Sequence, residues 1–216
     1  MSTLASTLRD QLLAFDADRF IETVKKSVDQ GHKPIEIVNA LTEVLKEIGR
    51  KFESGEIFLV HLVAAGDAAK RATVEVLEPL IKKSSQKRET LGKIVIGTVA
   101  GDIHDIGKNI VAMMLFTAGF EVYDVGKDIP AEEFVKKTRE FNADIVALSA
   151  LLTTTLPAQR DVIEALKKGG LREKVKVLVG GAPTTAKWAE EVGADGYGED
   201  AIEAVRIAKK LLGVKE

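Results

Sequence analysis

The stretch Lys93-Ile-Val-Ile-Gly-Thr-Val99 is followed, after one alanine, by Gly101-Asp-Ile-His-Asp-Ile-Gly-Lys-Asn109. The first part is a short apolar run rich in β-branched residues, which is typical of a strand buried on both faces. The second part contains two glycines and opens a helical pattern that continues to Ala118. Together they predict a strand, a loop and a helix, the repeating unit of a parallel α/β sheet.

The same alternation of strands and helices continues to the carboxyl terminus. The pattern predicts strands at residues 93–99, 120–125, 144–149, 175–179 and 195–197, and further helices at 131–141, 156–168, 186–192 and 201–212. Few topologies remain, because connections between parallel strands are right-handed. We expect an α/β domain with a doubly wound, five-stranded parallel sheet in flavodoxin-like (Rossmann-like) order.

Ligands bind a doubly wound sheet beyond the carboxyl ends of its strands, near the point where the strand order reverses. The loops after Val99, Ser149, Val179 and Tyr197 are therefore the candidate ligand-binding loops.

Toward the amino terminus the apolar residues recur instead at helical spacing, from residue 3 to about residue 83. We expect Gly31 to end the second helix and Pro34 to begin the third, because proline suits a first helical turn. A second break is expected from Gly49 to Gly55, after which residues 58–81 can form one long helix. Four helices in about 80 residues predict a small antiparallel bundle.

A polar, charged and aperiodic stretch, Lys82-Lys-Ser-Ser-Gln-Lys-Arg-Glu-Thr90, separates these two patterns. Such a composition is typical of an exposed linker. We therefore predict an all-α domain over residues 1–84, a linker over residues 85–92 and an α/β domain over residues 93–216.

The composition excludes several classes of function. The chain has no cysteine, so disulfides, thiolate nucleophiles, iron–sulfur clusters and cysteine-based zinc sites are excluded. A formal net charge of −2, with Lys and Arg spread along the chain, offers no basic stripe for nucleic acid. We also find no signal-peptide core and no run of about 18 apolar residues, so we expect a cytoplasmic protein that binds no membrane.

Three familiar motifs can be tested against the loop after the first strand. A dinucleotide fingerprint needs three glycines, and the loop offers only Gly101 and Gly107. A phosphate-binding P-loop needs four residues between its glycines and then Lys-Ser or Lys-Thr, whereas here five intervene and Asn109 follows Lys108. A phospho-acceptor receiver domain would need an aspartate at the end of the third strand, where this chain has Ser149. All three motifs are excluded.

What remains in this loop is Asp102-x-His104-x-x-Gly107, with Asp105 adjacent. A metal-bound histidine usually donates its other ring N–H to a carboxylate, and Asp102 could accept it from two residues away. Gly107 would let the backbone approach a bulky ligand closely. One histidine cannot hold a free zinc or iron ion, but it can supply one axial ligand to a macrocycle that provides four nitrogens. Alternatively, His104 is a surface or helix-capping residue.

The pattern Asp102-x-His104-x-x-Gly107 resembles the D-x-H-x-x-G motif of cobalamin-binding domains, as in methionine synthase, the carbon-skeleton mutases and the corrinoid proteins of methyltransferase systems. Two later segments resemble the same family, namely Ser149-Ala-Leu-Leu-Thr-Thr-Thr155 and Gly180-Gly181-Ala182. In that family these loops line a channel for the nucleotide tail of the cofactor. The resemblance implies cobalamin or a related cobalt corrinoid as the cofactor, with methylcobalamin as its loaded state.

The resemblance also implies a role for each matching residue. His104 would be the lower cobalt ligand and Asp102 its hydrogen-bond partner, so that the two form the catalytic pair. Thr155 lies where methionine synthase has a serine that extends this pair. Ser149 and Thr153 would contact the tail, although without the resemblance they are equally turn and cap residues. The expected cofactor-binding residues are Asp102, Ile103, His104, Asp105, Gly107, Ser149, Leu151, Thr153, Thr155, Gly180, Gly181 and Gly198.

The helical half carries a resemblance of its own. The segment Gly55-Glu-Ile-Phe58-Leu59 resembles the G-x-x-F-L-P signature of a four-helix module that caps the methyl face of the corrin. The chain departs from that signature at Val60, where proline is usual, and at His61, where an acid or glutamine is common. The contact surface of the cap is therefore open, and Phe58 and Leu59 could equally be core residues. We expect His61, like His32, to be a surface or helix-end residue.

No substrate site, barrel or redox motif is recognisable elsewhere, which favours a non-catalytic carrier subunit. The resemblance implies a methyl carrier that accepts a methyl group on cobalt from a substrate:corrinoid methyltransferase for methylamine, methanol or aryl methyl ethers. It would pass that group to an acceptor methyltransferase that uses tetrahydrofolate or coenzyme M, and a reductive activase is a further candidate partner. Two alternatives remain: a subunit of an adenosylcobalamin mutase, which normally lacks the cap, and a cobalamin-dependent sensor, which should carry a DNA-binding or signalling domain.

Overall fold

A computed structural model of the chain describes residues 3–83 and 90–214. The chain divides into two compact units, the first comprising residues 1–89 and 117–119 and the second residues 90–116 and 120–216. Most of the predicted linker lies outside the described residues. Within the described ranges, no helix combines the length and the apolarity that crossing a membrane requires.

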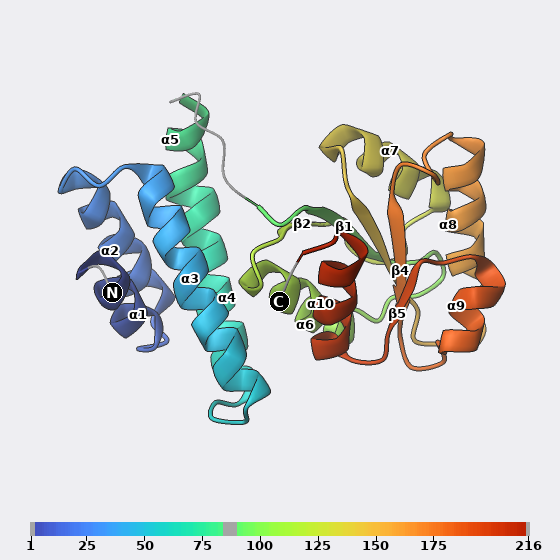
Figure 1. The fold of residues 1–216 in the computed structure, drawn as a ribbon, viewed down its shortest axis with the longest axis horizontal. Coiled ribbons are helices and arrows are strands. Elements are labelled where there is room, and N and C mark those ends of the chain that lie inside the picture. The colour runs from blue at the N-terminus through green and yellow to red at the C-terminus, as the bar shows by residue number, and fades with distance from the viewer. Residues whose placement is uncertain (1–2, 84–89, 215–216) are drawn as a thin grey trace. The chain divides into compact units, whose positions relative to one another are not determined.

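The first unit is built from helices in its described residues. They are α1 (Thr3–Leu12), α2 (Ala17–Asp29), α3 (Pro34–Glu53), α4 (Leu59–Ala72) and α5 (Glu78–Lys83), with a π-helical segment at Thr73–Leu77. Figure 1 shows α3 beside the rod formed by α4 and α5, and these helices are in contact. The buried residues of α3 repeat at helical spacing, as at Ile37, Leu41, Leu45 and Ile48. The predicted helical region is confirmed.

The helix boundaries in this unit follow the predicted signals in two places. Helix α2 ends at Asp29, shortly before Gly31 with a φ of 93°, and α3 begins at Pro34. The predicted long helix is continuous, but it is not α-helical throughout. The hydroxyl of Thr73 donates to the carbonyl of Ala69 at 2.8 Å where the π-helical segment begins. Such back-bonding by threonine is a common local cause of helix distortion.

The predicted break at Gly49 is wrong. Helix α3 continues through it to Glu53, and the break begins at Ser54. Ile48 is fully buried and continues the apolar stripe of this helix. Burial of that stripe outweighs the roughly 1 kcal/mol that a glycine costs inside a helix.

The second unit is built on a parallel sheet with the strand order β2-β1-β3-β4-β5. The strands are β1 (Lys93–Thr98), β2 (Glu121–Asp124), β3 (Ile145–Ser149), β4 (Lys176–Gly180) and β5 (Gly196–Gly198). The helices are α6 (Ile106–Thr117), α7 (Ala131–Phe141), α8 (Pro157–Lys168), α9 (Ala186–Val192) and α10 (Ala201–Leu211). The predicted α/β class and the flavodoxin-like strand order are confirmed.

Helices cover both faces of this sheet (Figure 1). On one face, Phe134 of α7, Val162 of α8 and Ala189 of α9 share a buried cluster with Val95 and Val146 of the central strands. Helices α6 and α10 lie on the other face. Because both faces are covered, the strands can be continuous apolar runs, as the sequence pattern indicated.

The carboxyl ends of four strands meet at one edge of the sheet. Thr98 of β1 pairs with Ser149 of β3, Ser149 with Gly180 of β4, and Gly180 with Gly198 of β5. The loops that follow these residues are therefore neighbours, and they include all four candidate ligand-binding loops.

Candidate cofactor-binding site

A cavity of about 550 Å³ lies at the carboxyl ends of β1, β3, β4 and β5. Its size and its mostly apolar walls are those of a small-molecule site. Of the twelve predicted cofactor-binding residues, those that line it are Ile103, His104, Asp105, Gly107, Ser149, Leu151, Gly180, Gly181 and Gly198. Asp102 and Thr155 are buried beside His104 rather than in the cavity wall, and Thr153 is exposed in the turn after β3.

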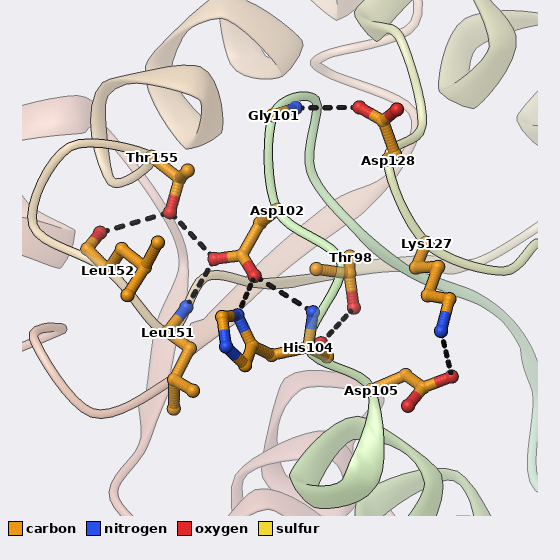
Figure 2. A network of polar contacts seen from close by, with 10 residues as sticks. All are labelled: Thr98, Gly101, Asp102, His104, Asp105, Lys127, Asp128, Leu151, Leu152 and Thr155. Atoms are coloured by element: carbon orange, nitrogen blue, oxygen red, sulfur yellow. Dashed lines mark hydrogen bonds and ion pairs between the residues drawn. The ribbon is translucent and has the colours of Figure 1, made fainter.

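The histidine and aspartate of the loop after β1 are in direct contact (Figure 2). Nδ1 of His104 lies 2.8 Å from Oδ1 of Asp102, and the backbone N–H of His104 donates to the same oxygen at 3.0 Å. The side chain of Asp102 is fully buried, whereas that of His104 is 46% exposed. The imidazole is therefore held along one edge and open to the cavity along the other.

The second carboxylate oxygen of Asp102 is bound by the loop after β3. The backbone N–H of Leu151 donates to Oδ2 at 2.7 Å, and the hydroxyl of Thr155 lies 2.6 Å from it. The Thr155 hydroxyl also lies 3.0 Å from the carbonyl of Leu152, which already accepts the Thr155 backbone N–H. A hydroxyl has one proton to donate. The shorter contact to the ionised carboxylate therefore receives it.

Four donors thus converge on one buried carboxylate. Burial by itself raises the pKa of Asp102, but the hydrogen bonds from Thr155, Leu151 and the backbone and ring of His104 outweigh it and hold this pKa well below its usual range. An ionised carboxylate only accepts hydrogen bonds, so Nδ1 of His104 carries the proton. The lone pair of Nε2 is then available to a ligand in the cavity.

The rim of the cavity carries large apolar side chains that face solvent. Ile103 is 65% exposed, Ile106 78% and Leu151 43%, and all three line the cavity together with His104. Clustered exposed apolar groups mark a ligand site. In residues 3–83 and 90–214, no three His, Asp or Glu side chains gather so as to hold a metal ion by themselves. These residues fit a large macrocycle that brings its own metal, to which Nε2 of His104 would supply one nitrogen ligand.

Several wall residues were not predicted from the sequence. Helix α6 contributes Ile106, Ile110 and Val111, and α10 contributes Ala201 and Ala204. Their spacing in α6 is that of an ordinary buried helix face. The only available signal was that Ile106 and Ile110 continue at helical spacing from Ile103, directly after the motif.

Gly181 shapes the cavity by allowing two loops to approach closely. Its φ is 122°, and a Cβ at this position would lie 1.8 Å from the backbone oxygen of Ala150. Glycine is therefore required here by the turn itself, beside any contact with a ligand.

We expect Gly181→Ala to lower the free energy of unfolding by about 3 kcal/mol, because it adds both backbone strain and a clash. Urea unfolding followed by circular dichroism measures this change. Gly193→Ala is the matched control, since Gly193 has a φ of 76° but nothing within 4 Å of an added Cβ. That variant should lose about 1 to 2 kcal/mol from the backbone conformation alone. Equal losses in the two variants would contradict the clash.

The helical unit also exposes apolar side chains. Phe58, at the start of α4, is 72% exposed, and Leu59, Val60 and Val63 are exposed as well. Phe58 is therefore not a core residue. Its backbone N–H donates to Nδ1 of His61 at 3.1 Å, so His61 caps the helix, as expected of a helix-end residue.

Comparison with known proteins gives matches along both units. Residues 92–206 match the family model of the B12 binding domain, and residues 4–77 match a second model of the same description. A dimethylamine corrinoid protein of Methanosarcina acetivorans is 48% identical over 210 residues, which cover 97% of this chain and 96% of the relative.

Two solved structures agree with these matches. A cobalamin-binding protein from Desulfitobacterium hafniense is 34% identical, with a TM-score of 0.65 and coverage of 96% of this chain and 98% of that chain. A chain of the methanol:cobalamin methyltransferase complex from Methanosarcina barkeri is 28% identical, with a TM-score of 0.85 and coverage of 98% and 80%. Fold, motif and relatives together show that this chain belongs to the family of B12-binding corrinoid proteins.

Proposed function

We propose that this chain is a methyl carrier, which holds a corrinoid in the cavity of its second unit and takes a methyl group from one methyltransferase to another. The observation that carries this proposal is the His104–Asp102 pair at the rim of an apolar cavity, with Nε2 of His104 unengaged by the carboxylate. The names of the relatives support the carrier function over a mutase subunit or a sensor.

His104 would ligate the metal of the cofactor, and the other predicted residues would hold the rest of the cofactor. When bound, the corrinoid supplies a cobalt ion that can accept and release a methyl group. Ile103, Ile106 and Leu151 would pack against the ring, since their exposed side chains lie at the rim. Ser149, Gly180, Gly181 and Gly198 would line the space for the nucleotide tail, with Thr153 at its entrance.

The hydrogen bonds of Asp102 determine where a proton can be held. Asp102 is saturated by four donors and stays ionised, so it is a poor proton acceptor. When His104 is not a ligand, its Nε2 is the remaining site for a proton in this pair. A protonated His104 would stay in place, because Nδ1 still donates to Asp102. The pair can thus gain and lose one proton without rearranging the loop.

The domain division belongs to the same proposal. Residues 1–84 would form the helical domain, residues 85–92 the linker and residues 93–216 the cofactor domain. The exposed apolar residues Phe58, Leu59 and Val60 would then give the helical domain an apolar surface for a partner.

The donor enzyme would be a methylamine:corrinoid methyltransferase, because a relative that is 48% identical is a dimethylamine corrinoid protein. The acceptor enzyme, using coenzyme M or tetrahydrofolate, and a reductive activase complete the proposed set of partners.

Transfer of a labelled methyl group tests the proposed function. Protein loaded with reduced cobalamin is mixed with labelled dimethylamine and a dimethylamine:corrinoid methyltransferase, and parallel reactions use trimethylamine and methanol with their own enzymes. The label should stay with the carrier through gel filtration and leave when the acceptor enzyme is added. A carrier that binds cobalamin but takes up no label from any of these donors would overturn the carrier function while leaving the cofactor in place.

A second prediction concerns Gly107, at the start of α6. Nothing lies within 4 Å of a Cβ added there, and alanine favours a helix by up to about 1 kcal/mol. We therefore expect Gly107→Ala to keep or slightly raise the stability of the cofactor-free protein. Its affinity for cobalamin should fall about tenfold, or roughly 1.4 kcal/mol, because the added methyl group would meet the bound cofactor. Thermal unfolding and a cobalamin titration measure the two effects, and an unchanged affinity would show that the cofactor does not approach Gly107.

A further inference from the structure

The backbone on both sides of Asp102 is held by a turn that is far away in sequence. The backbone N–H of Gly101 donates to Oδ1 of Asp128 at 2.7 Å, and the backbone N–H of Asp128 donates to the carbonyl of Asp102 at 2.9 Å. Figure 2 shows Asp128 on the opposite side of this loop from Leu151 and Thr155. Asp102 is thus held by its backbone from one side and by its carboxylate from the other.

Asp128 adopts a backbone conformation that is uncommon for residues other than glycine. Its φ is 56°, in the left-handed region, which aspartate tolerates at some cost. The turn around it is fixed to β1, because the N–H of Thr98 donates to the carbonyl of Gly126 and the N–H of Ile129 to the carbonyl of Thr98, both at 3.0 Å. Left-handed backbone that neighbouring contacts enforce is a recognised feature of functional sites.

The turn and the strand that anchors it each make one further contact with the histidine loop. Lys127, next to Asp128, lies 3.4 Å from the carboxylate of Asp105. The hydroxyl of Thr98, in the strand that anchors the turn, donates to the carbonyl of His104 at 3.0 Å. Every one of these contacts falls on the short segment that presents the imidazole.

We propose that Asp128 is a positioning residue for His104, which keeps the imidazole aimed at the metal of the bound corrinoid. This inference rests on the proposed function. Within residues 3–83 and 90–214, Asp102 is the hydrogen-bond partner of the imidazole, so the direction of the ring follows the position of Asp102. The hydrogen bonds from Leu151 and Thr155 hold only the carboxylate of Asp102, so by themselves they would allow its backbone to pivot about the carboxylate. Asp128 prevents this movement, because its two hydrogen bonds fix the backbone on both sides of Asp102.

Two substitutions of Asp128 separate the effect of its hydrogen bond to Gly101 from the effect of its left-handed backbone conformation. Asp128→Gly keeps the left-handed φ and the N–H that binds the Asp102 carbonyl, but removes the acceptor for Gly101. Gly101 is exposed, so water can satisfy its N–H and the fold should survive. Asp128→Asn keeps the acceptor, the N–H and the tolerance of positive φ, and is the matched control.

The full-length protein is loaded with cob(II)alamin, and the hyperfine coupling from the imidazole nitrogen is measured by electron paramagnetic resonance. We expect the fraction of cofactor with this coupling to fall several-fold in Asp128→Gly and to stay near the native level in Asp128→Asn. Amide hydrogen exchange at Asp102 and His104 in the cofactor-free protein should be about tenfold faster in Asp128→Gly, whereas the urea midpoint should change little.

The outcomes also separate this inference from the proposed function. A native protein without nitrogen coupling from His104 would overturn the ligand assignment itself. If Asp128→Gly keeps both the nitrogen coupling and the amide exchange rates of the native protein, only the positioning role of Asp128 is overturned.

Discussion

His104→Ala is expected to abolish the imidazole nitrogen coupling to the metal in protein loaded with cob(II)alamin. The reason is that Nδ1 of His104 is committed to the ionised Asp102, which leaves Nε2 as the nitrogen that can ligate. The variant should still bind cobalamin, because the walls of the cavity are formed by other residues. Loss of this ligand should weaken binding by at least about tenfold, because loss of a residue that only supports a ligand already costs about tenfold to a hundredfold. Electron paramagnetic resonance and a spectroscopic titration measure the two effects.

His32→Ala is a suitable control for that experiment. His32 is one of only three histidines in the chain, and it lies between α2 and α3 rather than in the cavity wall. Its removal should leave both the coupling and the affinity unchanged. If His104→Ala keeps the native nitrogen coupling, another group ligates the metal and the assignment of His104 as the ligand is wrong.

Patterns of local sequence were sufficient to predict the sheet, because its strands are buried on both faces. Each strand then reads as one apolar run, and the ends differ by only a residue or so, as in β4, which is predicted at 175–179 and observed at Lys176–Gly180. Gly49 shows where local patterns fail. A glycine weakens a helix locally, but packing of the whole buried stripe decides whether the helix continues, and packing is not visible in a local pattern.

The site was predictable where a motif carries it, and not where tertiary contacts create it. The family resemblance places Thr155 next to the His104–Asp102 pair, and in the structure its hydroxyl contacts Asp102. Asp128 could not be found in this way. It lies 27 residues from Gly101, and its role depends on a left-handed turn that no motif in this chain signals. Ile106 was missed because a helix face that lines a cavity has the same spacing as one that packs in a core.

Asp102→Asn is expected to have the second large effect, on the stability of the fold as well as on the site. The native carboxylate receives four hydrogen bonds, two at each oxygen, and is fully buried. An amide offers one accepting oxygen and one NH2 group, which only donates. The two donors at one of the native carboxylate oxygens would therefore face the NH2 group and lose their acceptor. Unsatisfied buried donors cost about 1 to 3 kcal/mol each, and we expect the free energy of unfolding at pH 7 to fall by about 2 to 4 kcal/mol.

The contribution of Asp102 to the free energy of unfolding depends on pH. The pKa of Asp102 is lowered in the folded state, so the ionised form stabilises the fold at every pH above the unfolded value of about 3.9. This stabilisation is lost as the pH falls below that value toward the folded pKa. The difference in unfolding free energy between the native protein and Asp102→Asn should therefore be constant near neutral pH and shrink below about pH 4.

Urea unfolding at pH 7 and near pH 3 tests this, with Asp105→Asn as the control. Asp105 is partly exposed and pairs with Lys127 at 3.4 Å, so its substitution should change stability by at most about 1 kcal/mol. A difference for Asp102→Asn that is equally small, or that grows on acidification, would contradict the assignment of Asp102 as a buried, ionised acceptor. The same substitution should also reduce the nitrogen coupling of His104, because an amide NH2 facing Nδ1 moves the imidazole proton to Nε2 and removes the lone pair that would reach the metal.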